Sequence, residues 1–241
     1  MYIKRIYPIL RMMKWTRWET MLFFIIALVP TILFEVFEFT WLQIPWTPIA
    51  LVGTALAFVI GFQNNAAYGR IWEARKIWGG IVNASRSWTI MVKDFINNDH
   101  AKVKRNDAEL QMIKRELVHR HVAWLTALRY QLRKDKPWEM HIKEQKSNKE
   151  FRETKFRVCE DEITVENAIK PYLSDEDFKN IFSKGNQASQ ILGIQSKRLK
   201  ELMAEGLIED FRHMEMANML VEFYALQGKS ERIKNFPYPR Q

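Results

Sequence analysis

The sequence predicts an all-α membrane protein, in which transmembrane helices continue into a large helical cytosolic domain. Hydrophobic residues make up 47% of the chain and charged residues 27%, but the apolar residues are densest before Phe62 and most of the charged ones follow Arg70. Two apolar stretches approach the roughly 20 residues that span a bilayer. No run of alternating β-branched residues predicts a strand. We therefore expect a membrane part followed by a soluble part.

The first expected span covers residues 21–39. Pro30 lies near its centre and predicts a kink, which neighbouring helices can tolerate in a membrane. Glu35 and Glu38 are expected at the interface or against a protein neighbour. A secretory signal peptide and a buried soluble hairpin are the alternatives. The apolar run is long for a signal peptide and no small-residue cleavage site follows it.

The second expected span covers residues 42–62. Pro45 and Pro48 suit a turn and a first helical turn, and Trp41 and Trp46 suit the interfacial belt. The loop near residues 40–47 has no Lys or Arg, whereas basic residues flank both spans: Lys4, Arg5, Arg11, Lys14, Arg17, Arg70, Arg75 and Lys76. The positive-inside rule then predicts that both ends of this chain are cytoplasmic. We expect a multi-pass protein of the cell inner membrane, with the lipid bilayer as a partner.

These patterns divide the chain into a basic cytoplasmic segment (1–19), a transmembrane hairpin (20–66) and a helical cytosolic domain (67–241). In the last part Ser174 is the expected N-cap of a short helix, Gly206 separates two longer helices and Gly228 ends the final one. A break is expected at 97–99 and a charged connecting arm at 134–158. The expected soluble helices are 107–132, 167–173, 175–182, 186–203 and 208–226.

Residue patterns for catalysis or cofactor binding are missing from the sequence. His119 and His121 are two residues apart on an expected helix and diverge, and Cys159 has no base near it in the sequence. No Gly-rich phosphate loop or zinc motif occurs. We expect no enzyme, cofactor or metal. The net charge of +9 suits a basic flank at a membrane better than nucleic acid, because Asp and Glu are interleaved with the basic residues.

The second span carries Thr54, Phe58 and Phe62 at i, i+4 and i+8, which places them on one helical face. The neighbouring face holds small residues at the same spacing, namely Gly53, Ala57 and Gly61. Phenylalanines in a membrane commonly pack in a bundle or face lipid. The alternative is an oligomer whose rings of Phe form an apolar throat that gates by dewetting. Asn64 and Asn65 would then line the vestibule below it.

The run GFQNNAAYGRIWEARKIWGGIVNASRSW (61–88) resembles the bestrophin family, in particular its bacterial members. Those typically show the pattern G-F-R-N-N-x-A-Y-x-R-x-x-E-x-R-x-x-W. The matching residues here are Gly61, Phe62, Asn64, Asn65, Ala67, Tyr68, Arg70, Glu73, Arg75 and Trp78. The tail GKSERIKNFPYPRQ (228–241) is similar to the segment that precedes the third membrane helix of the family.

The resemblance implies a homopentameric ion channel with one axial pore. The family's three apolar throat rings map to Thr54, Phe58 and Phe62, and Thr54 departs from the usual aliphatic residue, so the outer end of the throat should be wetter. The family also implies a second, cytosolic constriction early in the last soluble helix. Ile208 and then Leu207 are the candidates, with a core contact as the alternative for either.

The rest of the motif is expected to be structural rather than ion-binding. Arg70, Glu73 and Arg75 can pair on the helix or between subunits, and Trp72 and Trp78 are expected to anchor neighbouring helices. Related chains continue into two more membrane helices, so this sequence reads as a fragment or a shortened form.

For the function, the resemblance implies passive conduction of small anions, chloride first. There are two alternatives. One is a cation channel of the same fold, and the other is a membrane-anchored helical scaffold that conducts nothing. An apolar Phe throat has no charge with which to select either sign of ion.

Overall fold

A computed structural model describes residues 8–43, 45–139, 149 and 159–236. Within these ranges every regular element is a helix, which confirms the predicted all-α class. The chain forms two compact units. Residues 1–66 and 135–157 make up the first unit, and residues 67–134 and 158–241 the second. The expected connecting arm, 134–158, lies mostly outside the described residues.

The first unit contains α1 (Ile9–Trp15), α2 (Arg17–Glu35), the 3₁₀ turn η1 (Thr40–Leu42) and the first part of α3 (Trp46–Phe95). Helix α2 ends four residues before the predicted span does, and Glu38 beyond it adopts a left-handed φ of 54°. Helix α2 and the segment 40–95 are long and apolar enough to cross a membrane, and none of the residues in their most apolar windows is buried. A soluble hairpin would bury such helices, so their exposure argues for lipid as their neighbour.

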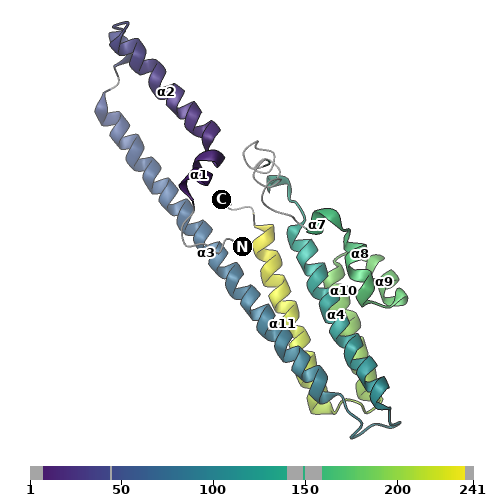
Figure 1. The fold of residues 1–241 in the computed structure, drawn as a ribbon. Coiled ribbons are helices and arrows are strands. Elements are labelled where there is room, and N and C mark those ends of the chain that lie inside the picture. Colours follow the sequence, from purple (N-terminus) through teal and green to yellow (C-terminus); the bar gives the residue numbers. More distant parts are fainter. Residues whose placement is uncertain (1–7, 44, 140–148, 150–158, 237–241) are drawn as a thin grey trace. The chain divides into compact units, whose positions relative to one another are not determined.

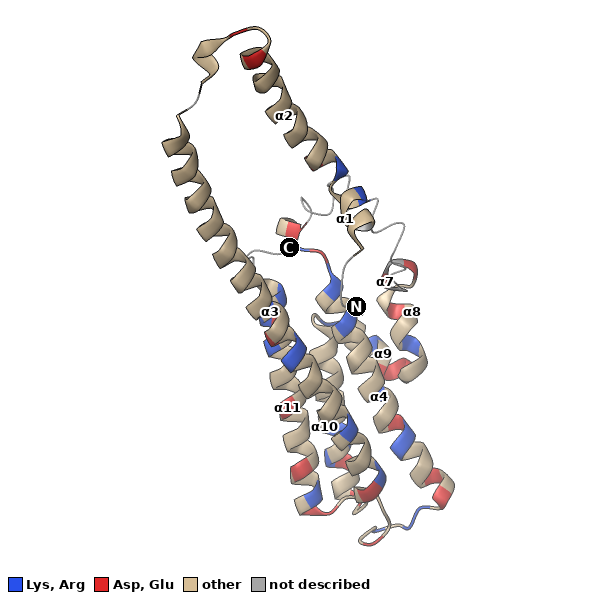
Figure 2. Cartoon of the chain, turned by 60° about the vertical axis from the view of Figure 1, so that its left-hand side comes forward, with Lys and Arg blue, Asp and Glu red and all other residues tan. Residues whose placement is uncertain are grey.

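Helix α3 has 50 residues and changes character along its length. No charged side chain occurs from Trp46 to Gly69, and Arg70 is the first (Figure 2). In the second unit, buried residues recur at helical spacing on α3, namely Ile77, Ile81, Ala84, Trp88 and Val92. This amphipathic spacing gives α3 one face for the core of that unit, while the opposite face stays exposed.

The second unit is a bundle of long helices with short ones packed on it (Figure 1). Helix α10 (Gln187–Ala204) contacts both α4 (Asp107–Arg133) and α11 (Asp210–Asn235). The short elements α8 (Val165–Ile169) and η2 (Lys170–Tyr172) pack against α4, and α9 (Asp175–Phe182) packs against α10. Helix α7 (Cys159–Glu162) precedes them in the chain.

Side-chain caps determine where these helices begin. Asn106 and Glu109 form a capping box at the start of α4, in which each side chain accepts from the backbone N–H of the other residue. Ser174 accepts from the N–H of Asp177, which confirms the predicted N-cap and the range of α9. Asn186 caps α10 in the same way, through the N–H of Ser189.

The two glycines that were expected to end helices behave differently. Gly206 has a φ of +79° and follows α10 in a Schellman arrangement, in which the N–H of Leu207 bonds to the carbonyl of Leu202. A Cβ at Gly206 would lie 2.2 Å from the carbonyl oxygen of His100, so no other residue fits there. Gly228 lies inside α11, which continues to Asn235, so the predicted end at 226 was wrong. Its neighbours Leu226 and Gln227 are buried, and this packing outweighs the weak helix propensity of glycine.

An aromatic cluster at the centre of the second unit joins three helices. Trp88 of α3, Trp124 of α4 and Phe223 of α11 are fully buried. Phe223 lies with its ring centroid 6.0 Å from that of Trp88, edge to face, and 4.9 Å from that of Trp124. The indole N–H of Trp124 donates to Gln227 Oε1 at 2.9 Å, which satisfies its buried polar atom.

His121 is part of this cluster, with its ring centroid 4.7 Å from that of Phe223. Its Nε2 lies 2.9 Å from Ser85 Oγ, and the Ser85 hydroxyl donates to the carbonyl of Ile81. Since the single hydroxyl proton of Ser85 is used there, Ser85 accepts the proton of His121 Nε2–H. Burial lowers the pKa of His121 to about 4.

We predict that acid destabilises the second unit through His121. The unfolded side chain titrates near its ordinary pKa of 6.5 and the folded one near 4, so the unfolded state binds more protons between these values. Stability is therefore complete above pH 6.5 and falls as the pH drops towards 4, by about 3 kcal/mol over the window. Thermal unfolding followed by tryptophan fluorescence at pH 7.5 and 4.5 measures this loss. The variant His121→Gln, which keeps a donor towards Ser85 but does not titrate, should show a smaller loss; an equal loss would contradict the assignment.

Candidate functional site

The three predicted throat residues occupy one exposed face of α3. Phe58 is 64% exposed and Phe62 71% exposed, and Thr54 is exposed one turn before Phe58. The Thr54 hydroxyl donates to the carbonyl of Ala50 at 2.8 Å, so its proton is used within the helix. This bond leaves the methyl group and the oxygen lone pairs available on the surface. The face is thus apolar, with a weak acceptor at one end.

The small residues beside this face leave room for a close neighbour. No heavy atom lies within 4 Å of the position that a Cβ would take at Gly53 or at Gly61. Small residues let membrane helices approach closely. Asn64 and Asn65 are exposed two and three residues after Phe62, where the apolar run ends.

Two residues of the family motif bind the end of α11 in the same chain. The guanidinium of Arg70 donates to the carbonyl of Ile233 and, at 3.0 Å, to that of Phe236. Glu73 accepts from Arg232 at 2.9 Å. The last carbonyls of a helix lack partners and lie at the negative end of its dipole, so a cation there is stabilising. We call these contacts the α11 clasp.

The clasp differs from the predicted pairing among Arg70, Glu73 and Arg75 on the helix. Arg70 and Glu73 both turn towards α11, because its carbonyl groups offer Arg70 acceptors in fixed positions. Arg75 is exposed and forms no ion pair with the residues that the structure describes. Burial lowers the pKa of Lys234, and the nearby Arg70 charge lowers it further.

The aromatic residues of the motif lie on the surface of the second unit. Tyr68 stacks on Trp72 with 6.3 Å between their ring centroids, and both are exposed. Trp78 is 45% exposed. The prediction that Trp72 and Trp78 anchor neighbouring helices stays a prediction, and their exposed area is available to a neighbour outside this chain.

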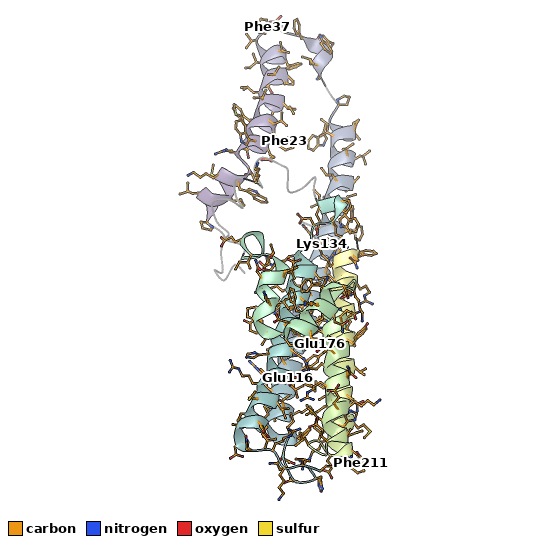
Figure 3. All side chains as sticks on the ribbon, turned by 90° about the vertical axis from the view of Figure 1, so that its right-hand side faces the viewer. Phe23, Phe37, Glu116, Lys134, Glu176 and Phe211 are labelled. Carbon is orange, nitrogen blue, oxygen red and sulfur yellow. The ribbon has the colours of Figure 1, made fainter. Side chains whose placement is uncertain are left out.

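The residues predicted for the cytosolic constriction lie in the core instead. Leu207 is 1% exposed and Ile208 2% exposed, and the carbonyl of Leu207 accepts from the N–H of Asn97. Within this chain both residues make core contacts, which is the alternative stated for each of them. Phe211, in the first turn of α11, is 75% exposed at one end of the bundle (Figure 3).

These features define a class of protein: an all-α membrane protein with two unburied apolar helical segments and a second helical unit built around a buried core. The sequence profile of the family described as "Bacterial/Fungal Bestrophin protein" matches residues 11–241. The chain belongs to this family, as the motif at 61–88 indicated. Residues 237–241 of the second motif lie outside the described part of the chain.

The chain is similar to proteins named as voltage-dependent anion channel-forming proteins. YneE of Escherichia coli K12 is 28% identical over 203 residues, which cover 83% of this chain and 54% of YneE. RSc3414 of Ralstonia nicotianae is 58% identical over 43 residues, 18% of this chain and 14% of that protein. The chain thus spans about half the length of its E. coli relative.

Solved structures support the fold. A crystal structure of a bacterial bestrophin homolog from Klebsiella pneumoniae superposes with a TM-score of 0.69, at 21% identity, over 93% of this chain and 69% of that one. Another structure of a homolog from the same organism superposes with a TM-score of 0.66 at 22% identity. The superposition covers 89% of this chain and 65% of that one.

We predict that the α11 clasp stabilises the second unit. Arg70→Ala removes two hydrogen bonds from a cation to helix carbonyls and should lower the free energy of unfolding by about 1–3 kcal/mol. Glu73→Gln breaks an exposed ion pair and should cost under about 1 kcal/mol. Arg75→Ala, an exposed arginine on the same helix, is the matched control.

Hydrogen exchange localises the effect. Arg70→Ala should speed exchange of the amides in the last turn of α11 more than of those in α10. Loss of protection that is equal in both helices, or a control as damaging as Arg70→Ala, would contradict the clasp.

Proposed function

We propose that this chain is a subunit of a homopentameric passive channel that conducts chloride and other small anions. The observation that carries the proposal is the exposed face of Thr54, Phe58 and Phe62 on α3, in a chain of the bestrophin family. The names of its curated relatives support an anion as the permeating ion. Passive conduction needs no catalytic group or cofactor. It needs only a pore through the membrane that protein side chains line.

In the proposed channel, each subunit presents the face of Thr54, Phe58 and Phe62 to the axis. Two rings of benzyl groups form an apolar throat that closes by dewetting, because water and ions leave a narrow apolar constriction. Thr54 makes the outer end of the throat wetter, and Asn64 and Asn65 line the vestibule, where amide N–H groups can replace part of the hydration of an anion.

The assembly we propose lies in the cell inner membrane, with α2 and the first part of α3 as its spans and both ends of this chain cytoplasmic. Open space at Gly53 and Gly61 allows a neighbouring helix to approach within the bilayer. The lipid bilayer is the expected partner of the unburied side chains of α2.

We place the cytosolic constriction at Phe211 rather than at Ile208 or Leu207. Phe211 is a large apolar side chain, it is exposed, and it lies in the first turn of α11. An apolar ring at the exit requires large, apolar and exposed side chains. Leu207 and Ile208 are apolar but buried.

Ion flux into liposomes tests the throat. The whole protein carrying Phe58→Ala or Phe62→Ala should leak anions about tenfold faster, the change that corresponds to about 1.4 kcal/mol of barrier. The control Phe23→Ala removes an equally exposed phenylalanine from α2 and should leave the flux unchanged. A confirmed oligomer that passes no ions in any of these forms would favour the scaffold and contradict the channel.

The second constriction has its own prediction. Phe211→Ala should raise single-channel conductance, because it widens a narrow exit, whereas Met112→Ala, another exposed apolar residue of the second unit, should not. If Phe211→Ala forms the oligomer in normal yield and its conductance is unchanged, the assignment of Phe211 to the cytosolic constriction is contradicted.

A further inference from the structure

Helix α11 carries an apolar stripe that the rest of the second unit leaves largely exposed. Its residues alternate at intervals of three and four, which places them along one side of the helix. They are Met214, Ala217, Val221, Tyr224 and Gly228. Met214, Val221 and Tyr224 are each more than half exposed, and no heavy atom lies within 4 Å of the place that a Cβ would take at Gly228. This α11 stripe is an open apolar surface along the helix.

Helix α3 carries a second exposed stripe within the same unit. Ile71, Trp78, Val82 and Thr89 follow one another by seven, four and seven residues, close to two, one and two helical turns. All four side chains are exposed. The Thr89 hydroxyl donates to the carbonyl of Ser85, so its methyl group remains for apolar contact. We call these four residues the α3 stripe.

Cations follow one flank of the α3 stripe. Arg86 comes four residues after Val82, and Lys93 comes four residues after Thr89, so both are turned by about 40° to the same side of the stripe. Both are exposed and form no ion pair with the residues in the described ranges. Asp94, the next residue, is turned by a further 100° or about that and lies farther from the stripe.

Acidic residues follow the corresponding flank of the α11 stripe. Glu215 comes directly after Met214, and Glu222 comes directly after Val221, so both are turned by about 100° in the same sense. Both are exposed, and neither forms an ion pair within the part of the chain that the structure describes. Arg212, three residues before Glu215, pairs with Glu209 instead. The two stripes therefore have flanks of opposite charge.

Contacts within the unit show which residues of α3 and α11 lie at the same level. The two helices run side by side in opposite directions (Figure 1). The N–H of Asn97, just after α3, bonds to the carbonyl of Leu207, and Leu226 lies against Gly80. Interpolation between these two contacts assigns each residue of α3 a level on α11.

The opposite charges lie at matching levels. Arg86 falls within one helical turn of the level of Glu222, and Lys93 falls within one turn of the level of Glu215. Seven residues separate the two cations, and seven residues also separate the two acidic residues. The two rows of charge therefore have the same length and run in opposite directions, as pairing between antiparallel helices requires.

We propose that the α3 stripe packs against the α11 stripe of a second copy of this chain. The inference rests on the proposed function, because it specifies how neighbouring subunits of the pentamer meet. The contact joins two different surfaces, so it is heterologous, and its repetition around an axis closes a ring. Rotation about an axis that runs along these helices keeps every residue at its own level. The levels found within one subunit therefore also apply between two copies.

Both charged flanks lie on the same side of this contact. The two helices face each other and are antiparallel, and each is right-handed, so the flank that each stripe has in the direction of increasing helical angle falls on one common side. Arg86 then meets Glu222 of the second copy, and Lys93 meets its Glu215. The apolar stripes are covered beside these ion pairs, and Trp78 comes level with the open space at Gly228.

The charges also select the register of the contact. A shift by seven residues in one direction would place Arg86 against Lys229, and like charges repel. A shift in the other direction would place Arg86 against Glu215 and leave Lys93 without an acidic partner. In the proposed register, Lys229 lies nearest to Arg75, so the favourable pairing is confined to the half of the contact that is farther from the α11 clasp.

Disulfide cross-linking of the whole protein in liposomes tests the contact. The variant Val82→Cys/Val221→Cys, in a Cys159→Ser background, should form covalent oligomers up to the pentamer when diamide oxidises the thiols. Either single variant should run as a monomer on a denaturing gel, because the contact joins residue 82 to residue 221. Asn83→Cys/Val221→Cys is the matched control. Asn83 is exposed but turned by about 100° from Val82, so this pair should cross-link about tenfold more slowly.

Exchange of charges tests the ion pairs. Arg86→Glu places a carboxylate against Glu222 and should lower the fraction of oligomer at a fixed detergent concentration by about threefold or more, because like charges repel. Glu222→Arg should have the same effect. The double variant Arg86→Glu/Glu222→Arg restores opposite charges and should restore the oligomer. Native mass spectrometry measures the oligomer fraction.

Failure of the contact differs from failure of the channel. An oligomer that passes ions, but whose Val82→Cys/Val221→Cys variant stays monomeric on the gel, would overturn the contact and leave the channel intact. Equal cross-linking of the Asn83→Cys control, or no recovery in the charge-exchanged double variant, would also overturn the contact. A cross-linked pentamer that passes no ions would support the contact and contradict the proposed function.

Discussion

The packing of Trp88, Trp124 and Phe223 is the interaction on which the second unit depends. It brings α3, α4 and α11 together around fully buried rings, and His121 and Gln227 complete the cluster with hydrogen bonds of 2.9 Å. Large aromatic side chains contribute much of the apolar area that a core buries. Because Trp88 faces this core, the helical period determines which residues of α3 in this unit remain outside it. The cluster therefore decides which side of α3 stays available to other molecules.

The two motif residues Arg70 and Glu73 show how a recognisable sequence pattern can contribute to the fold of the second unit. They bind the last turn of α11 within the same chain, at carbonyl groups that a helix end leaves without partners. Arg75 of the same motif is exposed and forms no ion pair within the part of the chain that the structure describes.

Residues 207–211 show the limit of predicting burial from residue type alone. Leu207, Ile208 and Phe211 are all apolar and lie at the start of one expected helix, so the sequence does not distinguish them. The Schellman turn at Gly206 directs Leu207 and Ile208 into the core, and Phe211 in the first turn of α11 remains outside. The difference comes from the direction in which the turn leads the chain, which depends on contacts with the backbone near His100.

The sequence by itself determined the helical class, the family and the face of Thr54, Phe58 and Phe62, because the helical period and a long motif are local properties. It also determined the cap at Ser174. Only the tertiary structure decided that Arg70 reaches α11, that α11 continues through Gly228 and that Ile208 is buried. These outcomes depend on which groups far apart in the chain become neighbours, and their burial and hydrogen bonds outweigh the local preferences that a sequence pattern records.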